Sequence, residues 1–352
     1  MRSRRPECLI ESKVGYFNLK HGRNSSRIQA VKRLWQEYPE IQTELEQVEK
    51  YIISNSSSRN SLLSKIAQEL AIAGGKRLRP AFVILSAKFG EYEGEKILPL
   101  AGAIEILHMA TLVHDDVVDR ASLRRGKPTV SEKYGIDMAV YTGDFLFTRA
   151  VLMLSKNVST DKLDYIARAI KTICEGEVDQ LCERFDPNVT FRSYFRRISK
   201  KTAVLFGASC LLGSDSAGCS PELSKRLARF GYYYGIAFQI RDDMLDFLST
   251  TGTSGKPVGN DISKGVFTLP VIYAMARNAS LKDIFRKPPE EEYDFGYKEM
   301  AEINRLVSEA GGMASAGEML KTYIARGHKV VDSLPENKYR GILRELISGL
   351  EL

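Results

Sequence analysis

The sequence is poor in the residues that build disulfide frameworks and zinc sites. Its 352 residues include five cysteines, an odd number without a C-x-x-C pair, and four histidines without an H-E-x-x-H pattern. Small secreted scaffolds and zinc sites depend on such pairs. The sequence therefore argues against both classes and favours a protein of the reducing cytoplasm.

Long hydrophobic runs are also missing. No stretch reaches the roughly 18 uncharged apolar residues that cross a bilayer, and the longest candidate, residues 202–214, is too short. Residues 1–27 are basic but lack the apolar block of a signal peptide. We expect a loose basic extension over 1–27 and one domain over 28–352, because no change in composition marks another boundary.

Charge leaves the class of partner open. The formal net charge of +7 at pH 7 favours anionic partners such as phosphates, nucleic acid or an acidic membrane, and it equally suits ordinary solubility. Hydrophobic residues make up 43% of the chain, which is ample for a large core.

Helical periodicity dominates the chain. Apolar residues recur at three- and four-residue steps over 28–52, and Asn60 or Ser61 is the expected N-cap of the next helix. Further helices are expected near residues 61–73, 77–90, 95–120, 137–155, 160–183, 190–213, 221–248, 265–278, 297–310, 314–332 and 338–350. Alternating strand patterns are absent, so the sequence predicts an all-α fold.

Two carboxylate triads lie within apolar helical segments. The motifs HDDVVD and RDDMLD share a D-D-x-x-D pattern and contain Asp115, Asp116, Asp119, Asp242, Asp243 and Asp246. The first and last aspartate of each motif are four residues apart, so they lie on one face of a helix. Like charges at that spacing destabilise a helix by about a few tenths of a kcal/mol per pair, so each triad needs a counter-charge.

Divalent cations are the counter-charge that fits these carboxylates best. Magnesium prefers oxygen ligands and usually bridges to substrate phosphates, whereas calcium is disfavoured because no EF-hand loop is present. A single triad could be a solvated acidic helix face. Two copies in apolar surroundings favour one Mg²⁺-diphosphate site, and the lack of a P-loop argues against nucleoside triphosphate chemistry of that type.

Basic residues gather beside turn signals. They lie in GGKRLRP, LRRGKP, SKKT and the segments that follow the second triad, as Lys76, Arg77, Arg79, Arg124, Arg125, Lys200, Lys201, Lys256 and Lys264. Surface solubility is the default for any one of the 51 lysines and arginines. Lys76, Arg79, Arg124 and Arg125 stand above that default, because glycines let backbone approach a phosphate and the first triad is adjacent. His114 is expected to be a packing residue.

Six segments occur in one order between residues 74 and 270: GGKRLRP, ILHMATLVHDDVVDRASLRRGKPT, YTGDFLF, KKT, FQIRDDMLDF and GKPVGNDISKGVFTLP. Together they resemble the trans-isoprenyl diphosphate synthases, or polyprenyl synthetases. Within that family the chain looks closest to the catalytic component of bacterial heptaprenyl or hexaprenyl diphosphate synthases. The resemblance implies the isoprenoid synthase fold, a single large helical bundle around a deep central cavity.

The resemblance also assigns roles to matching positions. Isopentenyl diphosphate would be bound by Lys76, Arg79, His108 and Arg125. The allylic diphosphate would be contacted by Arg124, Lys201, Thr202 and Gln239, with Lys256 and Lys264 nearby. Asp115 and Asp119, with Asp116 and the second triad, would coordinate Mg²⁺ and form the catalytic set with Lys201. Arg120 stands where many relatives have another aspartate, so the first cluster has one carboxylate fewer.

The implied activity is a Mg²⁺-dependent condensation of isopentenyl diphosphate with an allylic diphosphate such as farnesyl diphosphate. The product would be a medium- or long-chain all-trans polyprenyl diphosphate for quinone side chains. The resemblance implies a homodimer or a heterodimer with a small subunit, no nucleic-acid partner, and a cytoplasmic location. Transient contact with a membrane surface would serve release of the apolar product.

Product length is expected to depend on the helix that carries the first triad. Ala110 and Thr111 lie five and four residues before Asp115, about 6–8 Å along the helix at 1.5 Å per residue. Short-chain relatives typically have bulky aromatic residues there. The small side chains predict an open path and a product of about six to eight isoprene units by family analogy.

The alternatives are a terpene cyclase, a short-chain geranylgeranyl synthase and a non-catalytic subunit. Cyclases usually replace the second triad by an N/D-x-x-S/T-x-x-E pattern and lack GGKRLRP. Non-catalytic subunits generally lose the aspartates. Both triads and GGKRLRP are present here. A catalytic chain that is inactive without a small partner subunit stays open.

Overall fold

The computed structural model describes residues 35–248, 260–286, 295 and 297–352. Its longer helices are α2 (Pro39–Asn55), α3 (Ser61–Ile72), α4 (Leu78–Ala87), α5 (Gly94–Val118), α7 (Ile136–Asn157), α8 (Thr160–Cys182), α9 (Phe191–Ile198), α10 (Val204–Ser216), α11 (Pro221–Leu248), α13 (Leu269–Arg277), α15 (Tyr297–Glu309), α16 (Gly312–Asp332) and α17 (Lys338–Ser348). The all-α class predicted from the sequence is confirmed. The expected boundary at residues 27 and 28 lies outside the described residues.

Short elements complete the fold. They are the π-helix η1 (Ser199–Ala203), the helices α6 (Val130–Tyr134), α12 (Asn260–Ser263) and α14 (Ala279–Ile284), and the strands β1 (Leu123–Arg124) and β2 (Lys127–Pro128). The strands pair antiparallel, with Arg124 opposite Lys127. Arg125 and Gly126 form the turn between them with positive φ angles of 52° and 77°, as a two-residue type I′ hairpin requires.

The expected single helix over 28–52 is interrupted. Trp35 and Gln36 are helical, the helix breaks at Glu37 and Tyr38, and α2 begins at Pro39, while residues 28–34 lie outside the described residues. Tyr38 has φ −128° and ψ 72°, outside the helical region. Proline suits the first helical position, where no N–H is needed, and it disfavours helical geometry in the residue before it. The expected helix over 265–278 begins four residues later than predicted, at Leu269. The N-cap of α3 is Asn60, as expected, since its side chain accepts a hydrogen bond from Leu63 N at 3.0 Å.

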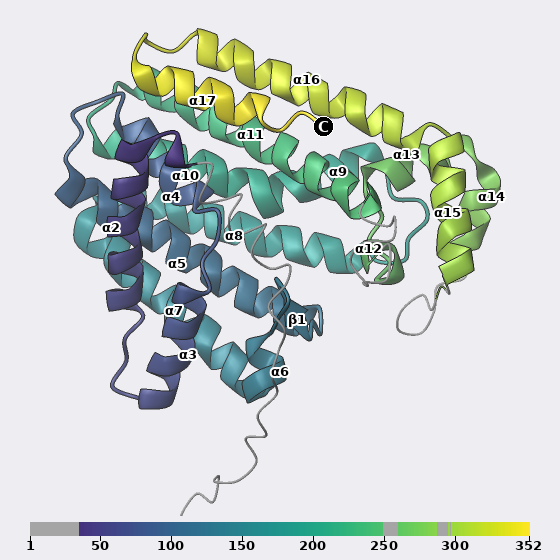
Figure 1. Cartoon of the computed structure of the whole chain (residues 1–352), viewed down its shortest axis with the longest axis horizontal. Coiled ribbons are helices and arrows are strands. Elements are labelled where there is room, and N and C mark those ends of the chain that lie inside the picture. Colours follow the sequence, from purple (N-terminus) through teal and green to yellow (C-terminus); the bar gives the residue numbers. More distant parts are fainter. Residues whose placement is uncertain (1–34, 249–259, 287–294, 296) are drawn as a thin grey trace, which may run out of the picture.

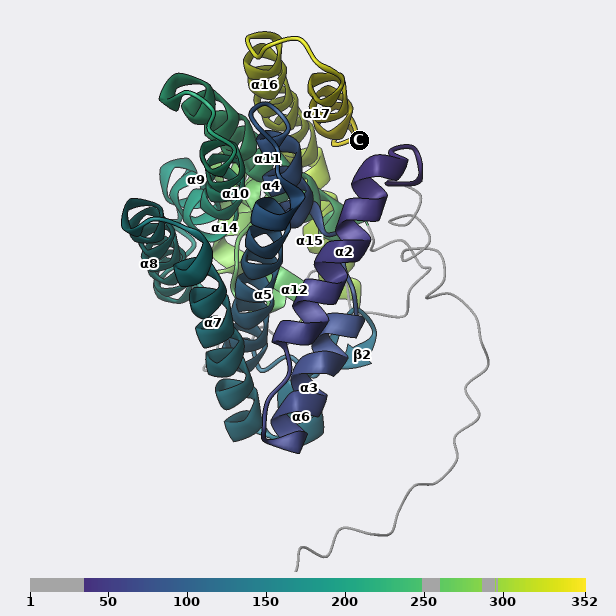
Figure 2. The same ribbon diagram turned by 90° about the vertical axis from the view of Figure 1, so that its left-hand side faces the viewer.

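Helix α5 lies inside the bundle and packs against α2, α4, α7 and α10 (Figures 1 and 2). Among the described residues it is the one helix long and apolar enough to cross a membrane by composition, with a mean hydropathy of 1.5 in its best window. Since 72% of that window is buried inside the protein, α5 reads as a core helix.

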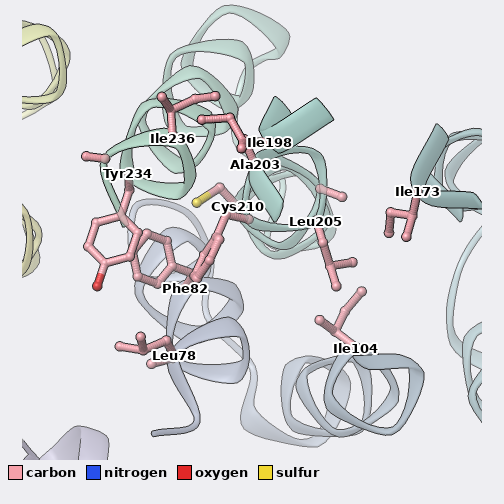
Figure 3. Packing of buried hydrophobic residues seen from close by; sticks show 14 of the residues in the cluster. Leu78, Phe82, Ile104, Ile173, Ile198, Ala203, Leu205, Cys210, Tyr234 and Ile236 are labelled. Carbon is pink, nitrogen blue, oxygen red and sulfur yellow. The ribbon is translucent and has the colours of Figure 1, made fainter. Parts of the chain in front are cut away.

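Large aromatic side chains fill the space between α4, α10 and α11. The Phe82 ring lies 5.3 Å from the Phe206 ring and 4.6 Å from the Tyr234 ring, measured between centroids. Figure 3 shows Phe82, Tyr234 and Cys210 pointing toward one another, with Ile104 of α5 close to Leu205 of α10. This core fixes α5 relative to α11, the two helices that carry the aspartate triads.

The C-terminal helices cover α11. Figure 1 shows α16 and α17 side by side along it, and α11 packs against α16 as well as α10. The second triad lies at the C-terminal end of α11, and the described chain resumes with α12. The fold thus brings segments far apart in sequence to the end of α5.

Candidate active site

The first triad lies in the last turn of α5. Asp115 and Asp116 belong to the helix, and Asp119 is its C-cap residue. The hairpin β1–β2 follows directly and turns the chain back toward the helix. Arg124 from that hairpin donates through Nε to both carboxylate oxygens of Asp116, at 2.8 and 2.9 Å. Asp116 is 6% exposed, and burial raises the pKa of its carboxyl against the opposing effect of Arg124.

Asp115 is half-buried beside Glu177 and Lys201. Burial raises the pKa of the Asp115 carboxyl to about 7, while the charge of Lys201 opposes that shift. Burial also disfavours the charged form of Lys201, yet Asp115 and Glu177 together raise its pKa. Lys201 Nζ donates to Glu177 Oε2 at 2.7 Å. Lys201 is therefore a charged group placed beside the first triad.

A π-helical turn presents Lys201. The expected helix over 190–213 is observed as α9 and α10 joined by η1, whose sequence is SKKTA. Such a wide turn is frequent at functional sites. Helix α8 packs closely against it at Gly176, where an added Cβ would come within 2.7 Å of Lys200 Cβ and 3.2 Å of Lys201 N. Glycine at this position lets the wide turn fit against α8.

The second triad has one member held by uncharged donors. Asp243 accepts hydrogen bonds from Tyr194 OH at 2.6 Å and from Gln239 Nε2 at 2.8 Å, one at each carboxylate oxygen. Thr202 Oγ1 in turn donates to Gln239 Oε1 at 2.7 Å. Burial raises the pKa of the Asp243 carboxyl to about 6. This chain of bonds fixes Thr202 and Gln239, two predicted site residues, on one network.

Asp261 of α12 is a further buried acid that the sequence analysis did not select. Burial and the negative charges of Asp246, Asp243 and Asp242 raise the pKa of its carboxyl to about 8. Lys201 opposes this shift as it does for Asp115. The charge of Lys201 therefore opposes the raised pKa of both Asp115 and Asp261.

Lys264 connects the segment after α12 to the first triad. It follows α12 and donates from Nζ to the backbone oxygen of Asp119 at 3.3 Å. Asp119 also accepts a hydrogen bond from Arg184 Nη2 at 2.6 Å. Segments around residues 119, 184 and 264 thus meet at the end of α5. Lys256 lies outside the described residues.

Predicted basic residues of the α4 side gather around His108. Arg79 Nη1 donates to His108 Nε2 at 2.9 Å, and the Arg79 guanidinium lies 4.6 Å from the Phe206 ring centroid. Burial lowers the pKa of Arg79 to about 10. Burial and the charge of Arg79 lower the pKa of His108 well below its usual range, so the imidazole is neutral and accepts this bond. Lys76 Nζ lies 5.8 Å from the Phe238 ring centroid.

Arg125 connects this basic cluster to the hairpin. Its Nη1 donates to the backbone oxygen of Gly74, in the turn that precedes Lys76. A Cβ added at Gly75 would lie 3.1 Å from the same Nη1. Glycine at position 75 therefore leaves room for the Arg125 side chain.

Other predicted positions lie along α5. Ala110 is 1% exposed, and Thr111 Oγ1 donates to the backbone oxygen of His108 at 2.8 Å. His114 turns toward α7, with Nε2 3.3 Å from Val140 O, and an added Cβ at Gly143 would lie 2.2 Å from that nitrogen. This close contact agrees with a packing role for His114.

The donor set fits magnesium. Within the described part of the chain, no three acidic, histidine or cysteine side chains converge to hold a metal by themselves. Magnesium is usually bound by one or two carboxylates, waters and substrate phosphates rather than by a complete protein cage. Buried carboxylates with raised pKa values beside arginine and lysine suit that arrangement.

Comparisons with known proteins point to one family. The family model described as polyprenyl synthetase matches residues 60–303. Component 2 of the heptaprenyl diphosphate synthase of Geobacillus stearothermophilus is 38% identical over 309 residues, which cover 88% of this chain and 95% of that protein. The octaprenyl diphosphate synthase of Escherichia coli (strain K12) is 41% identical over 224 residues, 64% of this chain and 69% of that protein.

Solved structures agree in fold. The heptaprenyl diphosphate synthase from Staphylococcus aureus superposes with a TM-score of 0.83 at 34% identity, covering 88% of this chain and 97% of that one. The polyprenyl synthase from Caulobacter crescentus CB15, complexed with calcium and isoprenyl diphosphate, gives a TM-score of 0.81 at 33% identity, covering 91% and 97%. This chain belongs to the polyprenyl synthetase family and is a trans-prenyltransferase with the isoprenoid synthase fold.

Proposed function

We propose that this enzyme condenses isopentenyl diphosphate with an allylic diphosphate, such as farnesyl diphosphate, and makes an all-trans polyprenyl diphosphate of about six to eight isoprene units for quinone side chains. The observation that carries the proposal is that Lys201 acts on Asp115 of the first triad and on Asp261, which lies close to the second triad, beside a separate basic cluster. A site with one acidic half and one basic half suits two diphosphates, the allylic diphosphate that leaves and the isopentenyl diphosphate that is retained. The heptaprenyl and octaprenyl relatives support the product range.

The acidic half would receive the allylic diphosphate. Bound Mg²⁺ would supply charge that stabilises the diphosphate leaving group as the allylic C–O bond breaks. We assign the metal ligands to Asp115 and Asp119 of the first triad and to Asp242 and Asp246 of the second, which are spaced four apart on their helices. Lys201 would bind the same phosphate oxygens directly.

Asp116 and Asp243 have a different task in this proposal. Each carboxylate already accepts two short hydrogen bonds from protein donors, Asp116 from Arg124 and Asp243 from Tyr194 and Gln239. We propose that they position these neighbours, so that Arg124 and Gln239 face the allylic diphosphate.

The basic half would hold isopentenyl diphosphate. Arg79 has a buried Nε without a hydrogen-bond partner among the described residues, and such a donor can take a phosphate oxygen. Lys76, Arg125 and neutral His108 would complete the cradle. The apolar interior would keep water from the allylic cation, and the departing diphosphate would accept the proton lost after C–C bond formation.

We propose that the enzyme works as a dimer, with a second copy or with a small subunit. Helix α7 carries exposed apolar side chains, Ile136 at 63% and Tyr141 at 64% exposure, with Val140 and Leu152 also exposed. The name component 2 of the Geobacillus relative favours a small partner as the second candidate arrangement. We place the enzyme in the cytoplasm, with transient contact at a membrane surface when the apolar product leaves.

The purified chain should turn farnesyl and isopentenyl diphosphates into a linear polyprenyl diphosphate when Mg²⁺ is present and should stop when EDTA removes it. Mass spectrometry of the product reads both the reaction and the number of units. A product that appears only with a small subunit would establish the heterodimer. A cyclic terpene, or consumption of farnesyl diphosphate without isopentenyl diphosphate, would contradict the condensation.

Ala110→Phe should shorten the product by at least one unit, because the phenyl ring would block the path about 8 Å beyond Asp115. Product length is the readout because it is independent of how much enzyme folds, which matters at a site 1% exposed. Ala110→Ser is the matched control, since its side chain stays small. Equal product lengths for the two variants would refute a role of Ala110 in length control.

The Mg²⁺ concentration for half-maximal activity should fall as pH rises from about 6 to about 8. Burial raises the pKa of Asp115 to about 7, so this ligand is largely protonated below that pH and must lose its proton to bind metal. Titrating Mg²⁺ at fixed diphosphate concentrations across this range, with Asp115→Asn as comparison, gives the measurement. A Mg²⁺ requirement that stays constant with pH would contradict metal binding by Asp115.

A further inference from the structure

A buried ion-pair cluster lies directly behind the basic half of the site. Its centre is Arg77, which sits between Lys76 and Arg79 in sequence and is 6% exposed. Arg77 donates from Nε and Nη2 to the two carboxylate oxygens of Glu49 on α2, at 2.5 and 3.0 Å. Its Nη1 donates to Glu105 of α5 at 2.7 Å. One side chain thus ties α2 and α5 to the start of α4.

The backbone at Arg77 is held in an unusual conformation. Arg77 precedes α4 with φ 47° and ψ 34°, a left-handed geometry that costs a non-glycine residue of order 1 kcal/mol or more. The preceding turn is fixed as well, because Trp35 Nε1 donates to the Lys76 backbone oxygen at 3.1 Å and Arg77 Nη2 donates to Ala71 O at 2.9 Å. These contacts set the directions in which Lys76 and Arg79 leave the backbone.

Glu105 is the anion that links the three arginines of this region. Its charge raises the pKa of Arg77, and it opposes the lowering that burial causes for Arg79 and Arg125. Glu105 is 5% exposed, so it cannot turn to water if its partner is removed. Arg79 bonds to His108, which lies three residues after Glu105 on the same face of α5. The buried Nε of Arg79 has no hydrogen-bond partner among the described residues, so Arg79 is the next cation available to Glu105.

We propose that Arg77 is a positioning residue for isopentenyl diphosphate. It fixes the loop that carries Lys76 and Arg79, and it engages Glu105 so that this carboxylate does not capture Arg79. Arg77 itself would not touch substrate, because its nitrogens already donate to Glu49, Glu105 and Ala71. The inference rests on the proposed function, in which Arg79 holds isopentenyl diphosphate.

The test compares Arg77→Met with Arg77→Met/Glu105→Gln. Loss of Arg77 should raise the KM for isopentenyl diphosphate by about tenfold or more, as expected when one charged hydrogen bond is lost to substrate. The kcat and the KM for the allylic substrate should change less than about twofold, since that half of the site is built from other residues. The second substitution removes the competing charge and should recover about threefold or more of the lost affinity.

Glu44→Gln is the matched control for a purely structural effect. Lys88 and Glu44 form a partly buried ion pair at 2.6 Å between the other end of α4 and the same helix α2. Losing it should lower the melting temperature as the Arg77 variants do but leave both KM values unchanged. Equal rises of both KM values in Arg77→Met, or no recovery on adding Glu105→Gln, would overturn the proposal.

Arg77→Lys keeps the experiment decisive if Arg77→Met does not fold. Lysine retains the charge that engages Glu105 but not the two-pronged bond to Glu49, so its KM should lie between wild type and the tenfold rise. A wild-type KM for isopentenyl diphosphate in Arg77→Lys would count against the claim that Arg77 fixes the loop of Lys76 and Arg79. Calorimetric titration of isopentenyl diphosphate reads binding without turnover. A wild type that binds it but forms no polyprenyl product would refute the proposed function alone.

Discussion

Burial of negative charge at the ends of two apolar helices is the constraint on which this structure depends. Desolvation raises the pKa values of Asp115, Asp243 and Asp261 to about 7, 6 and 8. A core helix such as α5 gains nothing for its own stability from such residues. They persist because other segments bring donors and cations to them, and those segments converge from α9, η1, α12 and the β1–β2 hairpin.

Helix geometry gives the three aspartates of each triad different directions and different partners. The first and last members share a helix face, whereas the middle member points about 100° away. In both triads the middle aspartate accepts hydrogen bonds at both carboxylate oxygens, from Arg124 at Asp116 and from Tyr194 and Gln239 at Asp243. Asp119 accepts one such bond, from Arg184. On the basic side, Arg77 bonds to Glu49 and Glu105. In the proposed function its neighbours Lys76 and Arg79 hold isopentenyl diphosphate, so residues of this motif would alternate between positioning and substrate binding.

The sequence was informative where chemistry and periodicity coincide. The motifs D-D-x-x-D in apolar helices and GGKRLRP are visible in the sequence alone, so the class of fold and the family could be predicted. Tyr194 could not, because it sits in the strongly basic, polar segment FRSYFRRI and yet is fully buried. Asp261 is a single acidic residue near glycines in the sequence, and only the folded structure brings it close to the second triad on α11.

Backbone features were harder still to predict. A π-helical turn leaves no residue signature, and η1 packs closely on Gly176 of α8, which is distant in sequence. The left-handed backbone at Arg77 likewise accompanies contacts with the distant residues Glu49 and Glu105. Local propensity governs most of the helices, and tertiary contacts govern the places where the site departs from a regular helix.

The central claim is that the six aspartates of the two triads divide into metal ligands and positioning groups. A crystal structure of the enzyme with an unreactive allylic diphosphate analogue and Mn²⁺ in place of Mg²⁺ tests it most directly, because anomalous scattering locates the metal. The account predicts metal on Asp115, Asp119 and the Asp242–Asp246 face, with Asp116 still bonded to Arg124 and Asp243 to Tyr194. Metal bound to Asp116 or Asp243, or diphosphate bound without either triad, would contradict it.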